Sequence, residues 1–164
     1  MPFYAIVFGK SIMIEKALSD DAEEILYLIN TSNREAYKDI IPKEHFKVPI
    51  LTLEELLEFF QRMTFYVHKS AGMIIGVAAL QIESEKTGRL HWVYVLPEYQ
   101  RRGIGTTLIT NLEKKAREIG FKKMRLRTIE KAEQAVNFYK KLGYHLAYKI
   151  EVPWGFMVSM EKDL

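Results

Sequence analysis

The segment that most constrains the fold is an apolar run followed by a glycine-rich turn and an amphipathic helix. The run RLHWVYV (89–95) has the composition of a buried strand, and GTTLITNLEKKAREIG (105–120) places its apolar residues at helical spacing. Gly103 and Gly105 stand at the join. The first N–H groups of a helix have no partner within the helix, and glycine lets a ligand approach the backbone closely. This strand, turn and helix therefore predict a binding site for an anion.

Two other phosphate-binding patterns do not fit. GKS at 9–11 resembles the end of a P-loop, but Tyr4 stands where that motif needs glycine. GIGTTL begins like the dinucleotide fingerprint, but Leu108 occupies the third glycine position. The four histidines have no metal-ligand spacing, so we expect no metal site.

The overall composition is that of one globular domain. With 164 residues, 48% of them hydrophobic and 27% charged, we expect a single domain over residues 1–164. The chain has no cysteine, and its N-terminal stretch has neither a basic start nor a small-residue cleavage site, so we expect a cytoplasmic protein. The most apolar run, MIIGVAAL, is too short to span a bilayer, so no membrane association is expected.

The flanking sequence predicts an alternation of strands and helices. Thr52 and Glu55 form a capping box at the start of a helix over 52–63, and Asp20 with Glu23 are placed similarly for a helix over 19–30. Two prolines and weak periodicity predict a loop or a broken helical region over 31–51. The remaining expected helices are 105–120 and 132–143, and the expected strands are 11–18, 64–69, 73–84, 89–95, 122–129, 144–152 and 156–162.

Two motifs resemble those of the GCN5-related N-acetyltransferases, the GNAT family. QRRGIG (100–105) fits that family's acyl-CoA signature, which is Gln or Arg, two residues, Gly, one residue, then Gly or Ala. AVNFYKKLGY (135–144) resembles its second marker, a helix with Phe-Tyr and a Lys-Leu-Gly-aromatic exit. The order of elements is similar over nearly the whole chain. The resemblance implies an α/β (α+β) fold: a single domain with a central mixed, mostly antiparallel sheet of about six or seven strands, about four flanking helices and a splayed cofactor cleft.

The same resemblance implies an enzyme that transfers an acetyl group from acetyl-CoA to a primary amine by direct attack in a ternary complex. The amides of the glycine-rich turn would bind the pyrophosphate, and the edge of strand 89–95 would bond the pantetheine arm like an added strand. The cleft would open between this strand and 122–129, at a bulge. Family members commonly begin the last helix with asparagine where Ala132 stands here. The implied cofactor-binding residues are Val93, Val95, Gln100, Arg101, Arg102, Gly103, Ile104, Gly105, Thr106 and Asn137.

Three side chains are candidate catalytic groups. Tyr139 aligns with the family's general acid, which protonates the leaving thiolate, although its ring can also pack on the sheet. The attacking amine must be neutral, and His91 is a candidate base because imidazole titrates near neutrality; a packed polar side chain is the alternative. Glu83 is a second candidate base, or else a solvent-facing carboxylate. Strict alternation places His91, Val93 and Val95 on one face, and the Val93 amide is a candidate oxyanion donor.

The acceptor side is less defined. In the family it comprises the first two helices with their joining loop and the final hairpin, which here supply Tyr37, Phe46, Trp154 and Phe156. These aromatics either line a pocket for a small-molecule or peptide amine or close the core under long loops. Polyamine, aminoglycoside, amino-acid and protein N-terminal acceptors all remain open. Family members often dimerise, so the resemblance also suggests a homodimer.

Two other classes of function are compatible with parts of the sequence. A non-catalytic acyl-CoA-binding or regulatory domain would keep QRRGIG and need neither Tyr139 nor a base. A nucleic-acid-binding module would use the basic residues at 114–127, but these have the pattern of solvated surface and lack a stacking-aromatic motif. With a formal charge of only +3, we expect no nucleic-acid partner.

Overall fold

The computed structural model describes residues 13–164. The first part of the strand expected at 11–18, and the N-terminal stretch that argued against a leader, lie outside these residues. The elements, in chain order, are β1 (Met13–Lys16), η1 (Ser19–Asp21), α2 (Ala22–Tyr37), η2 (Lys43–His45), α3 (Leu53–Arg62), β2 (Thr64–Ser70), β3 (Met73–Ser84), β4 (Thr87–Val95), η3 (Pro97–Tyr99), α4 (Ile104–Ile119), β5 (Lys123–Ile129), α5 (Glu133–Lys141), β6 (His145–Val152) and β7 (Gly155–Asp163).

The strands form one mixed sheet in the order β1-β2-β3-β4-β5-β7-β6. Every neighbouring pair is antiparallel except β4 and β5, which run parallel. The strands expected between 64 and 95 form an antiparallel meander, and the last two strands form a hairpin, with β7 inserted between β5 and β6. Seven strands and four α-helices among the described residues agree with the fold class that the resemblance implied.

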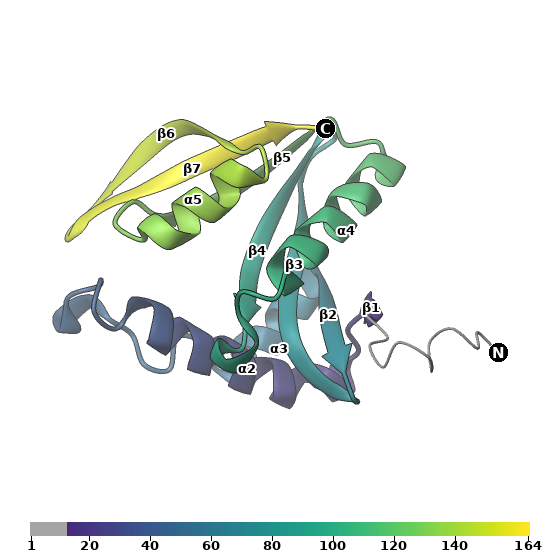
Figure 1. Cartoon of the computed structure of the whole chain (residues 1–164), viewed down its shortest axis with the longest axis horizontal. Helices are drawn as coiled ribbons and strands as arrows, with labels where there is room; N and C mark the ends of the chain where they lie inside the picture. Colours follow the sequence, from purple (N-terminus) through teal and green to yellow (C-terminus); the bar gives the residue numbers. More distant parts are fainter. Residues whose placement is uncertain (1–12) are drawn as a thin grey trace.

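The helices cover both faces of the sheet. In Figure 1, α2 and α3 lie beneath β2, β3 and β4, whereas α4 crosses the opposite face and α5 lies along β5 and β7. α4 approaches β3 closely at Gly76, where an added Cβ would lie 2.9 Å from Leu108 Cδ1 and 3.0 Å from Ile104 Cγ2. Buried aliphatic residues fill the space on both sides of the central strands. The contact at Gly76 fixes the height of the α4 N-terminus above the sheet.

The sheet separates into two arms between β4 and β5. These strands pair only between Thr87–Arg89 and Lys123–Arg125, while β5 stays paired with β7 along its length. β4 carries a bulge just beyond this point, where the register with β3 shifts between Val77 and Ala79 and Trp92 has a φ of +52°. The expected opening between 89–95 and 122–129, at a bulge, is therefore present.

The bulge makes the predicted alternation of faces along β4 wrong. His91 pairs with Ala79 and Tyr94 with Val77, so both lie on the face that carries α2 and α3. Val95 pairs with Gly76 on the α4 face and is therefore opposite to His91, not on the same face. The extra residue at the bulge reverses the order of faces, which a strict two-residue period does not allow for.

The helix after β1 is longer than expected. The segment 31–51 was predicted to be a loop or broken helix, yet α2 extends into it and ends at Tyr37. Asp20 and Glu23 do not form the predicted capping box; instead the Asp21 carboxylate accepts a hydrogen bond from the Leu18 N–H at 2.9 Å. The capping box of Thr52 and Glu55 is confirmed.

One buried ion pair fastens α4 to β7. The Glu113 side chain is only 2% exposed, and the Lys162 Nζ lies 2.7 Å from its Oε2 atom. We expect Lys162→Met to lower the free energy of unfolding by about 3 kcal/mol, because it leaves the carboxylate buried without its partner. Urea denaturation measures this loss. The double variant Glu113→Leu/Lys162→Met should recover most of it, and a single variant as stable as the parent would show that the pair is not needed.

Candidate active site

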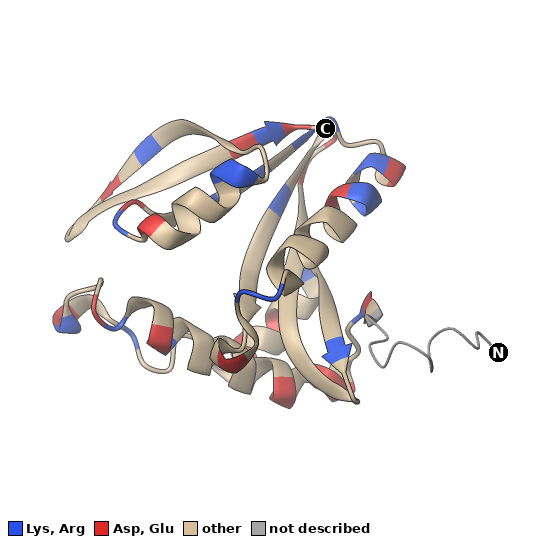
Figure 2. Cartoon of the chain, in the orientation of Figure 1, with Lys and Arg blue, Asp and Glu red and all other residues tan. Residues whose placement is uncertain are grey.

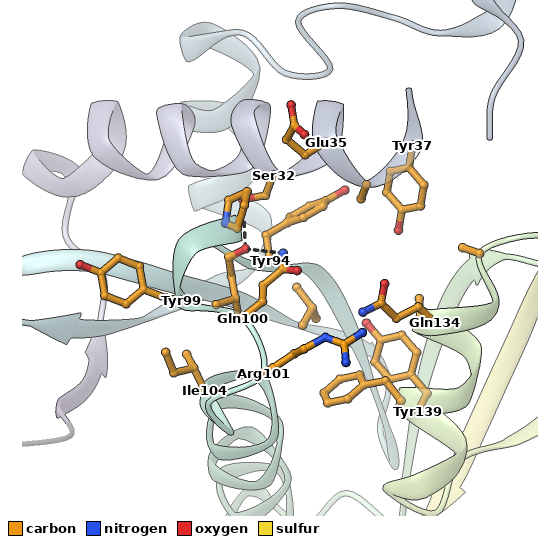
Figure 3. Close-up of a pocket in the computed structure, with 18 of the residues that line it drawn as sticks. Ser32, Glu35, Tyr37, Tyr94, Tyr99, Gln100, Arg101, Ile104, Gln134 and Tyr139 are labelled. Atoms are coloured by element: carbon orange, nitrogen blue, oxygen red, sulfur yellow. Dashed lines mark hydrogen bonds between the residues drawn. The ribbon is translucent and has the colours of Figure 1, made fainter. Parts of the chain in front are cut away.

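A cavity of about 780 Å³ lies where the two arms separate. Its walls come from the C-terminal half of α2, the end of β4, the turn before α4, the first turn of α4 and the start of α5. Figure 3 shows Tyr37 from α2, Arg101 from the turn before α4, and Gln134 and Tyr139 from α5 converging on it. We refer to this space as the large cavity.

The glycine-rich turn and the start of α4 form one wall of the large cavity. Gly103 is the N-cap residue with a φ of +78°, and the Thr107 N–H makes the first helical bond back to its carbonyl at 3.0 Å. The N–H groups of Ile104, Gly105 and Thr106 therefore have no partner within the helix. All three residues line the large cavity, which gives this wall the positive end of the helix dipole.

The two residues before Gly103 are arginines, which form the blue segment leading into α4 in Figure 2, and they have different roles. Arg101 has a φ of +62°, which is uncommon for a residue with a side chain, and its guanidinium points across the large cavity toward Tyr139 (Figure 3). Arg102 instead turns away, donating to the Glu98 carbonyl at 3.2 Å and lying over the Tyr99 ring. Arg102 lines neither the large cavity nor a second, smaller cavity between β4 and β5 that is described below. Only Arg101 therefore adds positive charge to this wall.

The carbonyl group at the end of β4 already accepts hydrogen bonds from other parts of the protein. The Val95 carbonyl accepts hydrogen bonds from the Gln100 side chain at 3.0 Å and from the Ser32 hydroxyl at 3.3 Å. Gln100 thus braces the turn, and Ser32 holds α2 against the strand. Val93 lies at the bulge and lines both cavities, so it is the strand position best placed to meet an extended ligand.

Tyr139 lies between the two cavities on α5. Its side chain is 8% exposed, it lines both cavities, and its ring contacts those of Phe138 and Tyr144. Burial is the main cause that raises its pKa well above the usual value, with smaller contributions from Tyr37 and Tyr94. The phenol is therefore protonated throughout the neutral range. The ring packs in the core while the residue also borders both cavities, so the expected packing role is present. The general-acid role of the hydroxyl stays a prediction.

A second cavity of about 330 Å³, the small cavity, lies between β4 and β5. It shares Tyr37, Val93, Tyr94 and Tyr139 with the large cavity, so the two spaces meet at these residues. Its remaining walls come from the middle of β4, from β5 and from Met157 of β7. The junction of the two cavities is the point where groups entering from opposite sides would meet.

His91 lines the small cavity, but it does not titrate near neutrality as expected. Burial first, and then the positive charges of Arg89 and Arg127, lower its pKa to about 4. Its Nε2 atom lies 2.7 Å from the Gln81 Oε1 atom. The imidazole is therefore neutral at physiological pH and is a weaker base than a free histidine.

The depressed pKa of His91 has a consequence for stability. In the unfolded chain the imidazole protonates near pH 6.5, so between about pH 4 and 6.5 the unfolded state binds more protons. The free energy of unfolding therefore falls as the pH is lowered through this window. We expect a loss of about 1–2 kcal/mol, less than the full shift implies because the ring is partly solvated.

The substitution His91→Gln, which can keep the bond to Gln81, should flatten this dependence. Urea denaturation between about pH 4 and 6.5 compares the two proteins. A change of the partner, Gln81→Glu, is less suitable because it would add a charge beside the imidazole. If the variant and the parent lose stability equally on acidification, His91 is not the group responsible.

Six predicted site residues do not line either cavity, and Arg102, described above, is the first of them. Glu83, near the outer end of β3, pairs with Arg89 and lies 3.7 Å from Arg125, so it is a structural carboxylate far along the strand from the junction. Asn137 is exposed on the outside of α5. The acceptor-side aromatics apart from Tyr37 also lie outside: Phe46, Trp154 and Phe156. The Phe156 ring instead lies under the Lys149 ammonium group.

Several cavity residues were not anticipated from the sequence. Gln134, in the first turn of α5, occupies the region where Asn137 was expected to act (Figure 3). Ser32 and Tyr94 line the large cavity, and the Tyr94 hydroxyl accepts from Asn33 Nδ2 at 2.9 Å. No spacing signal pointed to these residues, because α2 was expected to end before Ser32 and the bulge turns Tyr94 toward α2.

Two kinds of feature are absent from residues 13–164. Within this range, no group of three His, Cys, Asp or Glu side chains is arranged to hold a metal ion. No helix in the same range has the length and apolar character needed to cross a membrane.

Comparison with known proteins identifies the family. The family model described as "Acetyltransferase (GNAT) family" matches residues 26–144, well over half of the chain. The protein belongs to the GNAT acetyltransferase family, as the two sequence motifs indicated.

Relatives of established name match shorter stretches. Thialysine N-epsilon-acetyltransferase of Mus musculus is 40% identical over 65 residues, which are 38% of each chain. Glucosamine 6-phosphate N-acetyltransferase of Trypanosoma brucei brucei is 33% identical over 85 residues, 48% of this chain and 56% of that protein. The chain thus matches about two-fifths to just over half the length of these curated relatives.

Solved structures agree over nearly the whole chain. The PaiA N-acetyltransferase of Thermoplasma acidophilum, crystallised in complex with coenzyme A, has a TM-score of 0.78 and 24% identity, covering 94% of this chain and 100% of that one. This similarity establishes the fold. The family to which both chains belong uses acetyl-CoA as its cofactor.

Proposed function

We propose that this protein is an acetyl-CoA-dependent N-acetyltransferase, a single domain over residues 1–164 that transfers an acetyl group to a primary amine. The observation that carries the proposal is the meeting of two cavities at Tyr139, one of them walled by an unsatisfied helix N-terminus. The second motif of the sequence places the same tyrosine on α5. A cytoplasmic location and the absence of a nucleic-acid partner remain predictions of the sequence.

The volume of the large cavity and the donors along its wall support coenzyme A as its ligand. The free N–H groups of Ile104, Gly105 and Thr106, together with the Arg101 guanidinium, would hold the pyrophosphate. The backbone at Val93 would bond the pantetheine arm in the manner of strand addition. Gln134 is the polar side chain on α5 that would replace the asparagine common at the start of this helix.

Acetyl-CoA supplies a thioester, whose carbonyl carbon is attacked by the amine and whose C–S bond then breaks. In this scheme, Tyr139 holds the proton that the leaving thiolate needs, and its raised pKa keeps that proton in place before transfer. The Val93 N–H would donate to the oxyanion that forms on the carbonyl oxygen. No residue of the chain forms a covalent intermediate.

The removal of the amine proton does not require a strong base on the protein. His91 remains the candidate acceptor, and its neutral form leaves a lone pair free at Nδ1 when Nε2 donates to Gln81. The environment that depresses the pKa of His91 would also depress that of an ammonium group placed beside it. The amine would therefore lose its proton more easily inside the small cavity than in water. Glu83 is not proposed as a base, since it lies outside both cavities.

Calorimetric titration of acetyl-CoA into the full chain tests the proposal, followed by detection of thiol release with a panel of primary amines. We expect saturable binding and amine-dependent release of coenzyme A. Absence of binding at high micromolar concentration would contradict the proposal. Binding without turnover, unchanged by Tyr139→Phe, would favour a non-catalytic acyl-CoA-binding domain.

A further inference from the structure

The route by which the acceptor reaches the junction follows from the two cavities. If the cofactor occupies the large cavity, as proposed above, its thioester end arrives beside Val93 and Tyr139. These residues also form the inner end of the small cavity. The small cavity is then the space that remains for the acceptor, and the side chains that line it select which amines can enter.

The charged side chains that line the small cavity are both arginines, Arg89 and Arg127. Among the residues that the structure describes, no aspartate or glutamate lines it, and its other polar groups are neutral: His91, three tyrosines, Trp92 and Thr128. The acidic residues bordering the site, Glu35 and Glu133, line the large cavity. A cation such as a polyamine would meet like charge here without a compensating carboxylate.

The two arginines differ in how far their charge is already neutralised. Arg89 donates to Glu83, which also lies 3.7 Å from Arg125. Arg127 makes no ion pair with any carboxylate in residues 13–164, and its side chain is exposed on β5. Arg127 lies close enough to the neutral His91 and to Tyr148 of β6 for its positive charge to act on both groups. Arg127 is thus free to pair with an anion.

We propose that the acceptor is an amine that also carries an anionic group, a carboxylate or a phosphate, and that Arg127 binds this group while the amine reaches the junction at Tyr139. The guanidinium offers a fork of donors suited to either anion. Arg89 reinforces the positive potential from the neighbouring strand. This inference rests on the proposed acetyl transfer and restricts the acceptors open to it.

The test measures binding, so that it does not depend on finding the best acceptor. The full chain is saturated with coenzyme A, and a series of amino carboxylates of increasing length, their carboxamides, phosphoethanolamine, ethanolamine and putrescine are titrated at low salt. The same titrations are made with Arg127→Gln and with Arg117→Gln, an exposed arginine of α4 that lines neither cavity. Comparison of the amino carboxylates with phosphoethanolamine shows which of the two anions, carboxylate or phosphate, the site prefers.

We expect at least one anionic probe to bind in the millimolar range or tighter, about 10- to 100-fold better than its neutral counterpart. Arg127→Gln should remove this preference, and Arg117→Gln should keep it. Equal or tighter binding of putrescine, anion binding that survives Arg127→Gln, or no binding of any anionic probe would overturn the inference. Acetyl-CoA titrated into the same proteins before coenzyme A is added tests the proposed function separately. If acetyl-CoA binds and the results above fail, only the acceptor class is wrong.

Discussion

Tyr139→Phe is expected to lower kcat by about 100- to 10,000-fold, the range for loss of a general acid, while the affinity for acetyl-CoA changes by no more than about twofold. The ring is buried between Phe138 and Tyr144, and phenylalanine keeps this packing. Only the hydroxyl at the junction of the cavities is removed. Steady-state kinetics with a responsive amine, together with cofactor calorimetry, measures both quantities.

Tyr144→Phe is the matched control. Tyr144 is also buried, has a raised pKa caused mainly by burial and contacts Tyr139, but it lines neither cavity. Its variant should retain kcat within about threefold, because no acid–base contribution of the usual size is removed. Equal losses in the two variants would attribute the effect at Tyr139 to packing. Full activity of Tyr139→Phe would assign the acid role to another group or to water.

Thr106→Glu is expected to weaken acetyl-CoA binding by about 100-fold or more, since a carboxylate would stand within a few ångströms of the pyrophosphate. Thr106 is exposed in the first turn of α4 and lines the large cavity. Glutamate at this third helical position favours the helix dipole, so the fold should not be destabilised. Calorimetry gives the affinity, and urea denaturation checks the stability.

Thr110→Glu supplies the control for charge alone. Thr110 is exposed on the same helix, but it lies outside both cavities. Its variant should bind acetyl-CoA nearly as the parent does. Gly105 is a poorer choice for this test, because a Cβ there would lie 3.1 Å from Phe138 Cζ and disturb the packing of α5. Unchanged affinity in Thr106→Glu would place the pyrophosphate elsewhere.

The local elements near the site were predictable where short-range physics decides them. The capping box of Thr52 and Glu55 begins α3 as expected, and Gly120, with a φ of +106°, ends α4. The turn through Gly103 leads into α4 at the expected place. In each case, the start, end or turn is determined by the conformational preferences of a few residues that are neighbours in the sequence.

Other features were missed because long-range packing overrides the local pattern. α2 continues to Tyr37 despite weak periodicity, since the Asn30 side chain bonds both the N–H and the carbonyl of Leu51 and Ser32 bonds the end of β4. The bulge at Trp92 needs an extra residue opposite β3, which no alternation pattern in a single strand reveals. That bulge turns Tyr94 toward α2.

The sequence by itself determined the order of elements, the glycine-rich turn before α4 and the position of Tyr139 on its helix, because each is encoded by residues close together in the chain. Only the tertiary structure decided which side chains share a cavity. It placed Arg127 and His91 on facing strands, excluded Glu83 and Asn137, and lowered the pKa of His91. Burial and the approach of charges from separate strands produce these effects, and both arise only when the arms of the sheet come together.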